Sequence, residues 1–365
     1  MIDIIRPTLV LDKDVCINNI EKMAYKANKY NLRFRPHFKT HQSAKIGEWF
    51  KLFGVDAITV SSVQMAEYFA SHGWDDITIA FPVNILEIEN INRLAAAIKL
   101  NVIIENKEGA LALAQKITSP LGIYIKIDTG SNRSGILPGK INIIEALIKL
   151  TGTNKHLLFK GFLAHSGHTY QTKSPYEVFS LHFDALMKMR SLKQRYKHIF
   201  PHLEISIGDT PSISICDNFN GVDEIRPGNF VFYDLMQYKL GACTIEDIAV
   251  RLVSPVVAIQ SSRNEVVIYG GAIHLSKEPL LNINGKDMYG RVIITHNGER
   301  ILLGELNYVM RLSQEHGILK VMQKNLKYFT VGSLVEILPV HSCLTANLMR
   351  RYLTTEGEEI PMMNY

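Results

Sequence analysis

The chain has 365 residues, of which 47% are hydrophobic and 21% charged, which is the balance of an ordinary globular protein. Its net charge of +5 comes from 40 basic and 35 acidic residues scattered along the chain, which argues against a nucleic-acid-binding arm. No stretch is long and apolar enough to cross a bilayer, and the four cysteines form no CxxC pair, so we expect a cytoplasmic protein that binds neither nucleic acid nor membrane.

Residues 30–230 alternate short β-rich segments with amphipathic helical segments, as in successive βα units. The segments that read as strands begin near residues 33, 57, 77, 100, 122, 160, 203 and 223. Helical periodicity is clearest in 64–71, 85–98, 107–116 and 175–195. Parallel strands in this arrangement predict a closed (β/α)8 TIM barrel, which we place at residues 25–242.

Beyond about residue 245 the sequence changes to strands separated by turn sequences such as NGK, HNGE and VGS. The N-terminal RPTLVLD is also strand-like, and we expect it to pair with this C-terminal region instead of the barrel. The predicted second domain is therefore mostly β and consists of residues 1–24 and 243–365.

In a barrel of this kind, catalytic residues follow the C-terminal ends of the strands. Polar, glycine and titratable residues follow five of the predicted strands here, at 37–41, 128–135, 165–170, 208–211 and 226–229. Because Gly, Asp and Asn are common in turns, about half of these residues could be present only as turn formers. This explanation fits the histidines and the lysine less well. The sequence therefore predicts one active site at this end of the barrel.

Lys39 follows the first predicted strand directly. A lysine at a strand end is usually a solvated surface charge, but in a barrel mouth its amine can form an imine. The glycine turns around Gly208 and Gly228 add backbone N–H groups that can bind a phosphate. A Schiff-base lysine beside a phosphate site indicates pyridoxal 5'-phosphate.

The chain resembles the fold-type III pyridoxal-phosphate enzymes, and among them the group of D-threonine aldolase and eukaryotic-type D-serine dehydratase. The resemblance covers nearly the whole chain and rests on motifs in the same order, namely RPTLVLD, RPHFKTH, DTGSNRSG, HSGHTY, GDTPS, EIRPGNFVFYD and PVHSCLTANL. It implies an alanine racemase-like barrel followed by a β domain, paired into a head-to-tail homodimer.

The same resemblance implies roles for individual residues. The residues expected to bind the cofactor are Lys39, Arg133, Tyr170, Thr210, Gly228 and Asn229. Lys39 is the expected Schiff-base lysine, and the turns around Thr210 and Gly228 are the expected phosphate site. Arg133 and Tyr170 are expected at the pyridine ring or its hydroxyl, and their roles are not separated.

His341 and Cys343 offer an imidazole and a thiolate near the end of a predicted strand, and both are good zinc ligands. Two such residues alone are more often structural. The resemblance implies a divalent-metal pair at this position, His with Cys in the dehydratase branch and His with Asp in characterised D-threonine aldolases. Cys343 therefore favours the dehydratase branch, with Zn²⁺ as the metal and Mn²⁺ or Mg²⁺ as alternatives.

These residues predict a metal-dependent lyase that acts on D-3-hydroxy amino acids and converts D-serine to pyruvate and ammonia. Lys39 would remove the Cα proton, and the metal would assist the departure of the hydroxyl. In an aldolase, His165 or His168 would instead act as base on the hydroxyl, and the products would be glycine and an aldehyde. A racemase shares the fold but needs no metal, and a non-enzymatic cofactor-binding protein would need neither the β domain nor the metal pair.

Overall fold

The computed structural model describes residues 4–364. These residues form two compact units. The first, here the barrel unit, consists of Ile20–Phe230 and Leu240–Ala242. The second, here the β unit, consists of the described residues up to Asn19, of Val231–Lys239, and of the chain from Cys243 onwards. The domain limits expected from the sequence, near residues 24 and 242, stay a prediction.

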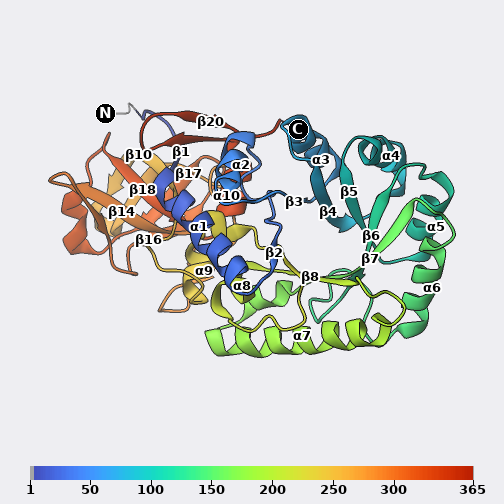
Figure 1. Ribbon diagram of the computed structural model, residues 1–365. Helices are drawn as coiled ribbons and strands as arrows, with labels where there is room; N and C mark the ends of the chain where they lie inside the picture. Colours follow the sequence, from blue (N-terminus) through green and yellow to red (C-terminus); the bar gives the residue numbers. More distant parts are fainter. Residues whose placement is uncertain (1–3, 365) are drawn as a thin grey trace. The chain divides into compact units, whose positions relative to one another are not determined.

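The barrel unit is built on one parallel sheet of eight strands in the order β2-β9-β8-β7-β6-β5-β4-β3 (Figure 1). The strands are β2 (Arg33–Phe34), β3 (Ile58–Val60), β4 (Asp76–Pro82), β5 (Lys99–Ile104), β6 (Leu121–Ile127), β7 (Leu157–His165), β8 (Glu204–Gly208) and β9 (Glu224–Ile225). A parallel bridge between His37 and Thr59 links the two ends of this order. The predicted eight-stranded TIM-like architecture is confirmed.

Helices follow the strands, as the sequence pattern predicts. They are α2 (Ala44–Lys51), α3 (Val63–Ser71), α4 (Ile88–Ala97), α5 (Lys107–Lys116), α6 (Ile141–Thr151), α7 (Pro175–Tyr196) and the short α8 (Thr210–Ile215), and α1 (Lys13–Lys29) precedes β2. Side chains before several of these helices accept a hydrogen bond from the first turn, among them Ser62, Asn106 and Ser174. Such caps satisfy backbone donors that a helix start leaves free and fix where each helix begins.

A buried ion-pair network joins the residue that follows β2 to β4 and β9. Arg35 is only 1% exposed, and its Nη1 and Nε each lie 2.6 Å from a carboxylate oxygen, of Asp76 and of Glu224. A buried guanidinium is tolerated only when its donors are paired in this way. The network fixes the strand that leads directly into the loop of Lys39.

The β unit contains an antiparallel sheet in the order β11-β17-β16-β14-β18-β10-β1-β19-β20, with β15 beside β14. Its strands are β1 (Thr8–Leu11), β10 (Val250–Gln260), β11 (Glu265–Tyr269), β14 (Gly290–His296), β15 (Glu299–Leu302), β16 (Tyr308–Leu312), β17 (His316–Lys320), β18 (Leu334–Pro339), β19 (Arg351–Thr354) and β20 (Glu359–Pro361). A separate hairpin is formed by β12 (Leu280–Leu281) and β13 (Asp287–Met288). Two helices, α9 (Leu235–Lys239) and α10 (Ser342–Met349), complete the unit.

The N-terminal strand belongs to the β unit. β1 pairs antiparallel with β10 and parallel with β19, which confirms that RPTLVLD joins the C-terminal region. Val256, Val266 and Ile268 are at most 1% exposed and lie in the apolar core of this unit. Within residues 4–364, no helix is both long and apolar enough to span a membrane.

Candidate active site and metal pair

The loop of Lys39 is held by main-chain hydrogen bonds on two sides. His37 N donates to Pro227 O at 2.8 Å, and Phe38 N donates to Thr59 O at 2.9 Å. The ring of His37 adds a third bond, because its Nδ1 accepts from the backbone N of Lys39 at 3.3 Å. The side chain of Lys39 is itself exposed. The structure thus presents this lysine to solvent from a fixed backbone after β2.

The start of α8 contains a buried hydroxyl group that has no partner among residues 4–364. It is Oγ1 of Thr210, whereas the hydroxyl of Ser212 lies beside the carboxylate of Asp209. The carboxylate of Asp209 already accepts from Ser212 N at 2.7 Å, and Tyr170 Oη accepts from Thr210 N at 3.3 Å. A buried hydroxyl without a partner is costly, so its presence indicates a ligand with acceptor oxygens.

Gly228 leaves no room for a side chain. A Cβ at this position would lie 2.9 Å from His37 O and 3.2 Å from Thr40 Oγ1. The turn after β9 therefore lies directly against the loop of Lys39. The next residue, Asn229, is 4% exposed. The expected phosphate residues and the expected Schiff-base lysine thus belong to loops that touch each other.

Arg133 lies on the loop after β6, which is fixed by Asp128. Asp128 Oδ1 accepts from Gly130 N at 2.9 Å and from Asn132 N at 3.2 Å. Gly135 has a φ of +108°, and a Cβ there would lie 2.7 Å from Asp128 N, so the turn requires glycine. Arg133 is exposed beside this turn, and its charge lowers the pKa of His165.

His165 ends β7, and His168, three residues further along, lies against the loop after β6. A Cβ on Gly130 would lie 3.3 Å from His168 Nε2, and the ring of His165 lies 6.4 Å from that of Tyr170. Burial, followed by the charges of Lys126 and Arg133, lowers the pKa of His165 well below its ordinary value. His165 is therefore neutral at neutral pH and can accept a proton.

Three further residues, for which no role is expected from the sequence, belong to this cluster. They are His37, Lys126 and Arg226. Lys126 lies within β6, a strand that is otherwise apolar. Burial lowers the pKa of this lysine to about 7. Arg226 is 4% exposed and donates from Nε to Ser206 Oγ at 2.7 Å and from Nη2 to Ala164 O at 2.6 Å. A charged residue inside an apolar strand, as at Lys126, is the signal that could have revealed the cluster.

The cluster brings several cationic side chains together. Burial lowers the pKa of His37, and the charges of Lys39, Arg226 and Arg133 lower it further. Nearby carboxylates partly balance the buried cations, whereas Lys39 and Arg133 are exposed, so this region is open to an anionic ligand. Together with the unpartnered hydroxyl of Thr210 and the close approach at Gly228, these residues fit pyridoxal 5'-phosphate.

His341 and Cys343 lie in the β unit, directly after β18. His341 precedes α10, and Cys343 lies in its first turn. His341 Nδ1 is 2.5 Å from Glu278 Oε2. Burial alone would lower the pKa of His341, but hydrogen bonds with the side chains of Cys343 and Glu278 raise it to about 11.

An imidazole beside a thiol, with a carboxylate behind the imidazole, is a donor set that suits zinc. No group of three or more His, Cys, Asp or Glu side chains that could hold a metal is found among residues 4–364. His341 and Cys343 could therefore offer a metal two side-chain ligands.

Comparison with known proteins agrees with this architecture. Residues 11–235 match the family model of the alanine racemase N-terminal domain, and residues 249–355 match that of the serine dehydratase domain. D-serine dehydratase of Dictyostelium discoideum is 29% identical over 374 residues, which cover 94% of this chain and 91% of that protein. D-threo-3-hydroxyaspartate dehydratase of Delftia sp. is 27% identical over 358 residues, which cover 93% of this chain and 91% of that protein.

Two solved structures show the same fold. A cysteine-to-alanine mutant of D-threo-3-hydroxyaspartate dehydratase in the metal-free form has a TM-score of 0.89 at 24% identity, covering 100% of this chain and 98% of that chain. D-threonine aldolase from Filomicrobium marinum has a TM-score of 0.82 at 20% identity, covering 98% of this chain and 96% of that chain. The alanine racemase model alone spans more than half of the chain. This chain therefore belongs to the family that joins an alanine racemase N-terminal domain to a serine dehydratase domain, the family of pyridoxal-phosphate-dependent D-amino acid dehydratases and aldolases.

Proposed function

We propose that this protein is a lyase that removes water from D-3-hydroxy amino acids and converts D-serine to pyruvate and ammonia. The observation that carries the proposal is the arrangement of the barrel unit, in which the loop of Lys39 lies against the turn of Gly228 and close to several cationic side chains. The dehydratase relatives, which align over more than nine-tenths of this chain, support the choice of reaction.

In the proposed site, Lys39 binds the cofactor covalently, and Thr210, Ser212, Gly228 and Asn229 surround its phosphate. The cofactor supplies an electron sink that makes the Cα proton of the substrate acidic. The amine of Lys39 would accept this proton.

His165 fits either reaction of the family. Because burial lowers its pKa well below the ordinary value, its ring is neutral at neutral pH, which suits the base of an aldolase and makes the ring a weak acid toward a departing hydroxyl. Hydroxide is a poor leaving group, so dehydration needs another source of assistance. A divalent metal can supply it as a Lewis acid.

We place this metal at His341 and Cys343. Glu278 holds Nδ1 of His341, and the side chain of Cys343 hydrogen-bonds with the same imidazole, so a metal that displaces the shared proton would meet a nitrogen and a sulfur donor. A metal-free form has been described for the cysteine mutant of the related dehydratase, which supports a cysteine ligand in that protein. Zinc suits a nitrogen and sulfur donor pair better than magnesium or manganese does.

The deciding experiment is to incubate the purified protein with D-serine and D-threonine and to assay pyruvate, 2-oxobutyrate, glycine and acetaldehyde. We expect the 2-oxo acids together with ammonia. Glycine and an aldehyde as the main products would show that the protein is an aldolase and not a dehydratase. Racemised substrate alone would refute the proposed lyase activity.

The lysine assignment has its own test. The purified protein should show the visible absorption of lysine-bound pyridoxal phosphate, and Lys39→Ala should lack it. Lys45→Ala is the control because Lys45 lies six residues further along, within α2. A visible band that persists in Lys39→Ala would refute the role of this residue.

The homodimer and the cytoplasmic location expected from the sequence are part of the proposal. All four cysteines are free, which suits a reducing compartment. Sedimentation equilibrium of the purified protein measures the oligomeric state directly.

A further inference from the structure

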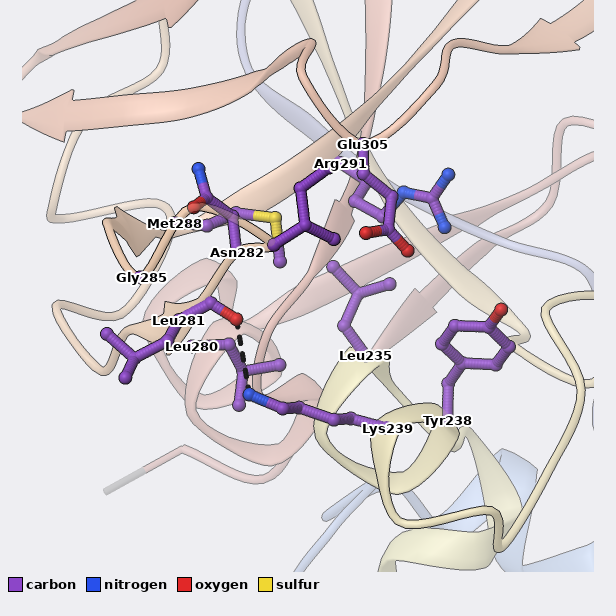
Figure 2. A pocket seen from close by; sticks show the side chains of 11 residues that line it. Leu235, Tyr238, Lys239, Leu280, Leu281, Asn282, Gly285, Met288, Arg291 and Glu305 are labelled. Carbon is purple, nitrogen blue, oxygen red and sulfur yellow. Dashed lines mark hydrogen bonds between the residues drawn. The ribbon is translucent and has the colours of Figure 1, made fainter. Parts of the chain in front are cut away.

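The β unit contains a cavity that the proposed reaction does not use. Its volume is about 340 Å³, and α9, the β12–β13 hairpin, β14 and the loop before β16 form its walls. Figure 2 shows the lining side chains. None of the residues that we assign to the cofactor or to the metal lines this cavity.

Most of the lining is apolar, contributed by Leu235, Leu280, Leu281, Ile283 and Met288. Leu281 is 55% exposed and Ile283 is 66% exposed, so these side chains leave apolar surface open at the cavity. Such a wall suits the apolar part of a small ligand.

Three charged residues also line the cavity, and none of them has a partner of opposite charge within residues 4–364. They are Lys239, Arg291 and Glu305. Arg291 is 8% exposed, and its side chain makes one hydrogen bond with the described residues, from Nη2 to Leu303 O at 3.3 Å. A guanidinium has five N–H donors, and a buried one without a counter-ion is unfavourable. Arg291 therefore indicates an anion in this cavity.

Glu305 gives the cavity a second kind of polar group. Its side chain is half-buried and makes no hydrogen bond or ion pair with any described residue, although Arg291 lines the same cavity. In the view of Figure 2, the guanidinium of Arg291 and the carboxylate of Glu305 lie at the same end, above Leu235. Lys239 lies below Leu235, where its Nζ donates to Leu281 O at 3.2 Å. One end of the cavity thus offers a cation and an anion together.

The walls are held in place without a ligand. Asp234 Oδ1 accepts from Gln237 N at 3.0 Å at the start of α9, and Met236 N donates to Val340 O at 3.2 Å. In the hairpin, Asn282 Oδ1 accepts from Asn284 N at 2.9 Å and from Lys286 N at 3.0 Å. A preformed cavity with few, fixed polar groups is typical of a small-molecule site.

We propose that this cavity binds a free amino acid with an apolar side chain. Its carboxylate binds Arg291, its ammonium group binds Glu305, and its side chain packs against Leu235, Leu280 and Met288. The inference goes beyond the proposed lyase reaction and does not depend on it, because the ligand needs no 3-hydroxyl group and contacts no cofactor residue.

The test is isothermal titration calorimetry of the full-length protein with L-leucine and D-leucine. Two analogues serve as comparisons, 4-methylpentanoate, which lacks the ammonium group, and 3-methylbutylamine, which lacks the carboxylate. We expect at least one leucine enantiomer to bind and both analogues to bind at least about 10-fold more weakly. Absence of binding by both enantiomers, or equal binding of 4-methylpentanoate, would overturn the proposal.

Variants locate the binding. Glu305→Gln keeps the shape of the side chain and should weaken leucine binding about 10-fold or more, whereas Glu299→Gln, an exposed residue of the same unit, should not. Arg291→Gln should abolish binding, and circular dichroism checks that this variant is folded. If Arg291→Gln is not folded, the effect of Glu305→Gln on leucine binding alone tests the site. Lys39→Ala should bind leucine unchanged, and loss of binding in that variant would assign the ligand to the cofactor site and overturn the proposal.

Discussion

Glu278 Oε2 lies 2.5 Å from Nδ1 of His341, although the two residues are 63 positions apart in the sequence. A carboxylate at one ring nitrogen fixes the orientation of an imidazole and directs the other nitrogen to a metal. The proposed metal pair therefore has a third participant that does not itself bind the metal.

Glu278→Ala should weaken zinc binding about 10- to 100-fold, because the ring of His341 would lose its orienting partner. Titration of the metal-free protein with zinc in the presence of a competing chelator measures this change. Glu299→Ala, an exposed glutamate of the same unit, is the control. Unchanged zinc affinity in Glu278→Ala would show that the carboxylate does not support a metal ligand.

Gly228→Ala should weaken the binding of pyridoxal 5'-phosphate. Its Cβ would lie 2.9 Å from His37 O, so the turn or the loop of Lys39 must move. Gly139→Ala is the matched control in the same unit, since no atom lies within 4 Å of a Cβ there. Equilibrium dialysis gives the affinity, and equal affinities in the two variants would contradict a tight contact at Gly228.

Thr210→Val should stabilise the cofactor-free protein by about 1 kcal/mol, because it removes a buried hydroxyl that has no partner. The same change should weaken binding of the cofactor phosphate. Thr169→Val should instead destabilise the protein by about 1 kcal/mol or more, since Thr169 Oγ1 donates to Ser166 O and lies 3.0 Å from Asp209 Oδ1. Urea unfolding of both variants without cofactor makes the comparison, and a loss of stability in Thr210→Val would contradict the prediction.

Lys126 should make the stability of the cofactor-free protein depend on pH. Burial lowers its pKa from 10.5 to about 7 in the folded chain, so between these values the unfolded chain binds more protons. The free energy of unfolding should therefore rise with pH across this window, with a slope on the order of 1 kcal/mol per pH unit.

Lys126→Met should remove that rise, whereas Lys116→Met, at an exposed position of α5, should keep it. Urea unfolding at a series of pH values from about 7 to 10.5 measures the slope. Parallel curves for Lys126→Met and the unmodified chain would mean that Lys126 is charged in the folded barrel.

The sequence by itself determined the order and type of the elements in the barrel. The strands are short apolar segments, and their positions at 33, 57, 77, 100, 122, 160, 203 and 223 match β2–β9. The periodicity of 107–116 matches α5, and Pro175 marks the start of α7. These signals are local, because a period of two or of 3.6 residues is visible within one segment. The motifs also placed the Lys39 loop and the Gly228 turn after strands.

Only the tertiary structure decided which of these residues meet. Arg226 and Lys126 join the cluster around His165 because the parallel strands bring residues 100 positions apart in the chain to one end of the barrel. Glu278 carries no signal in the sequence, since its partner His341 lies on another segment of the β unit. The cavity of Arg291 and Glu305 likewise depends on four separate segments. A sequence pattern records which face of its own segment is buried, whereas a pair of side chains from distant segments is defined only when the chain has folded.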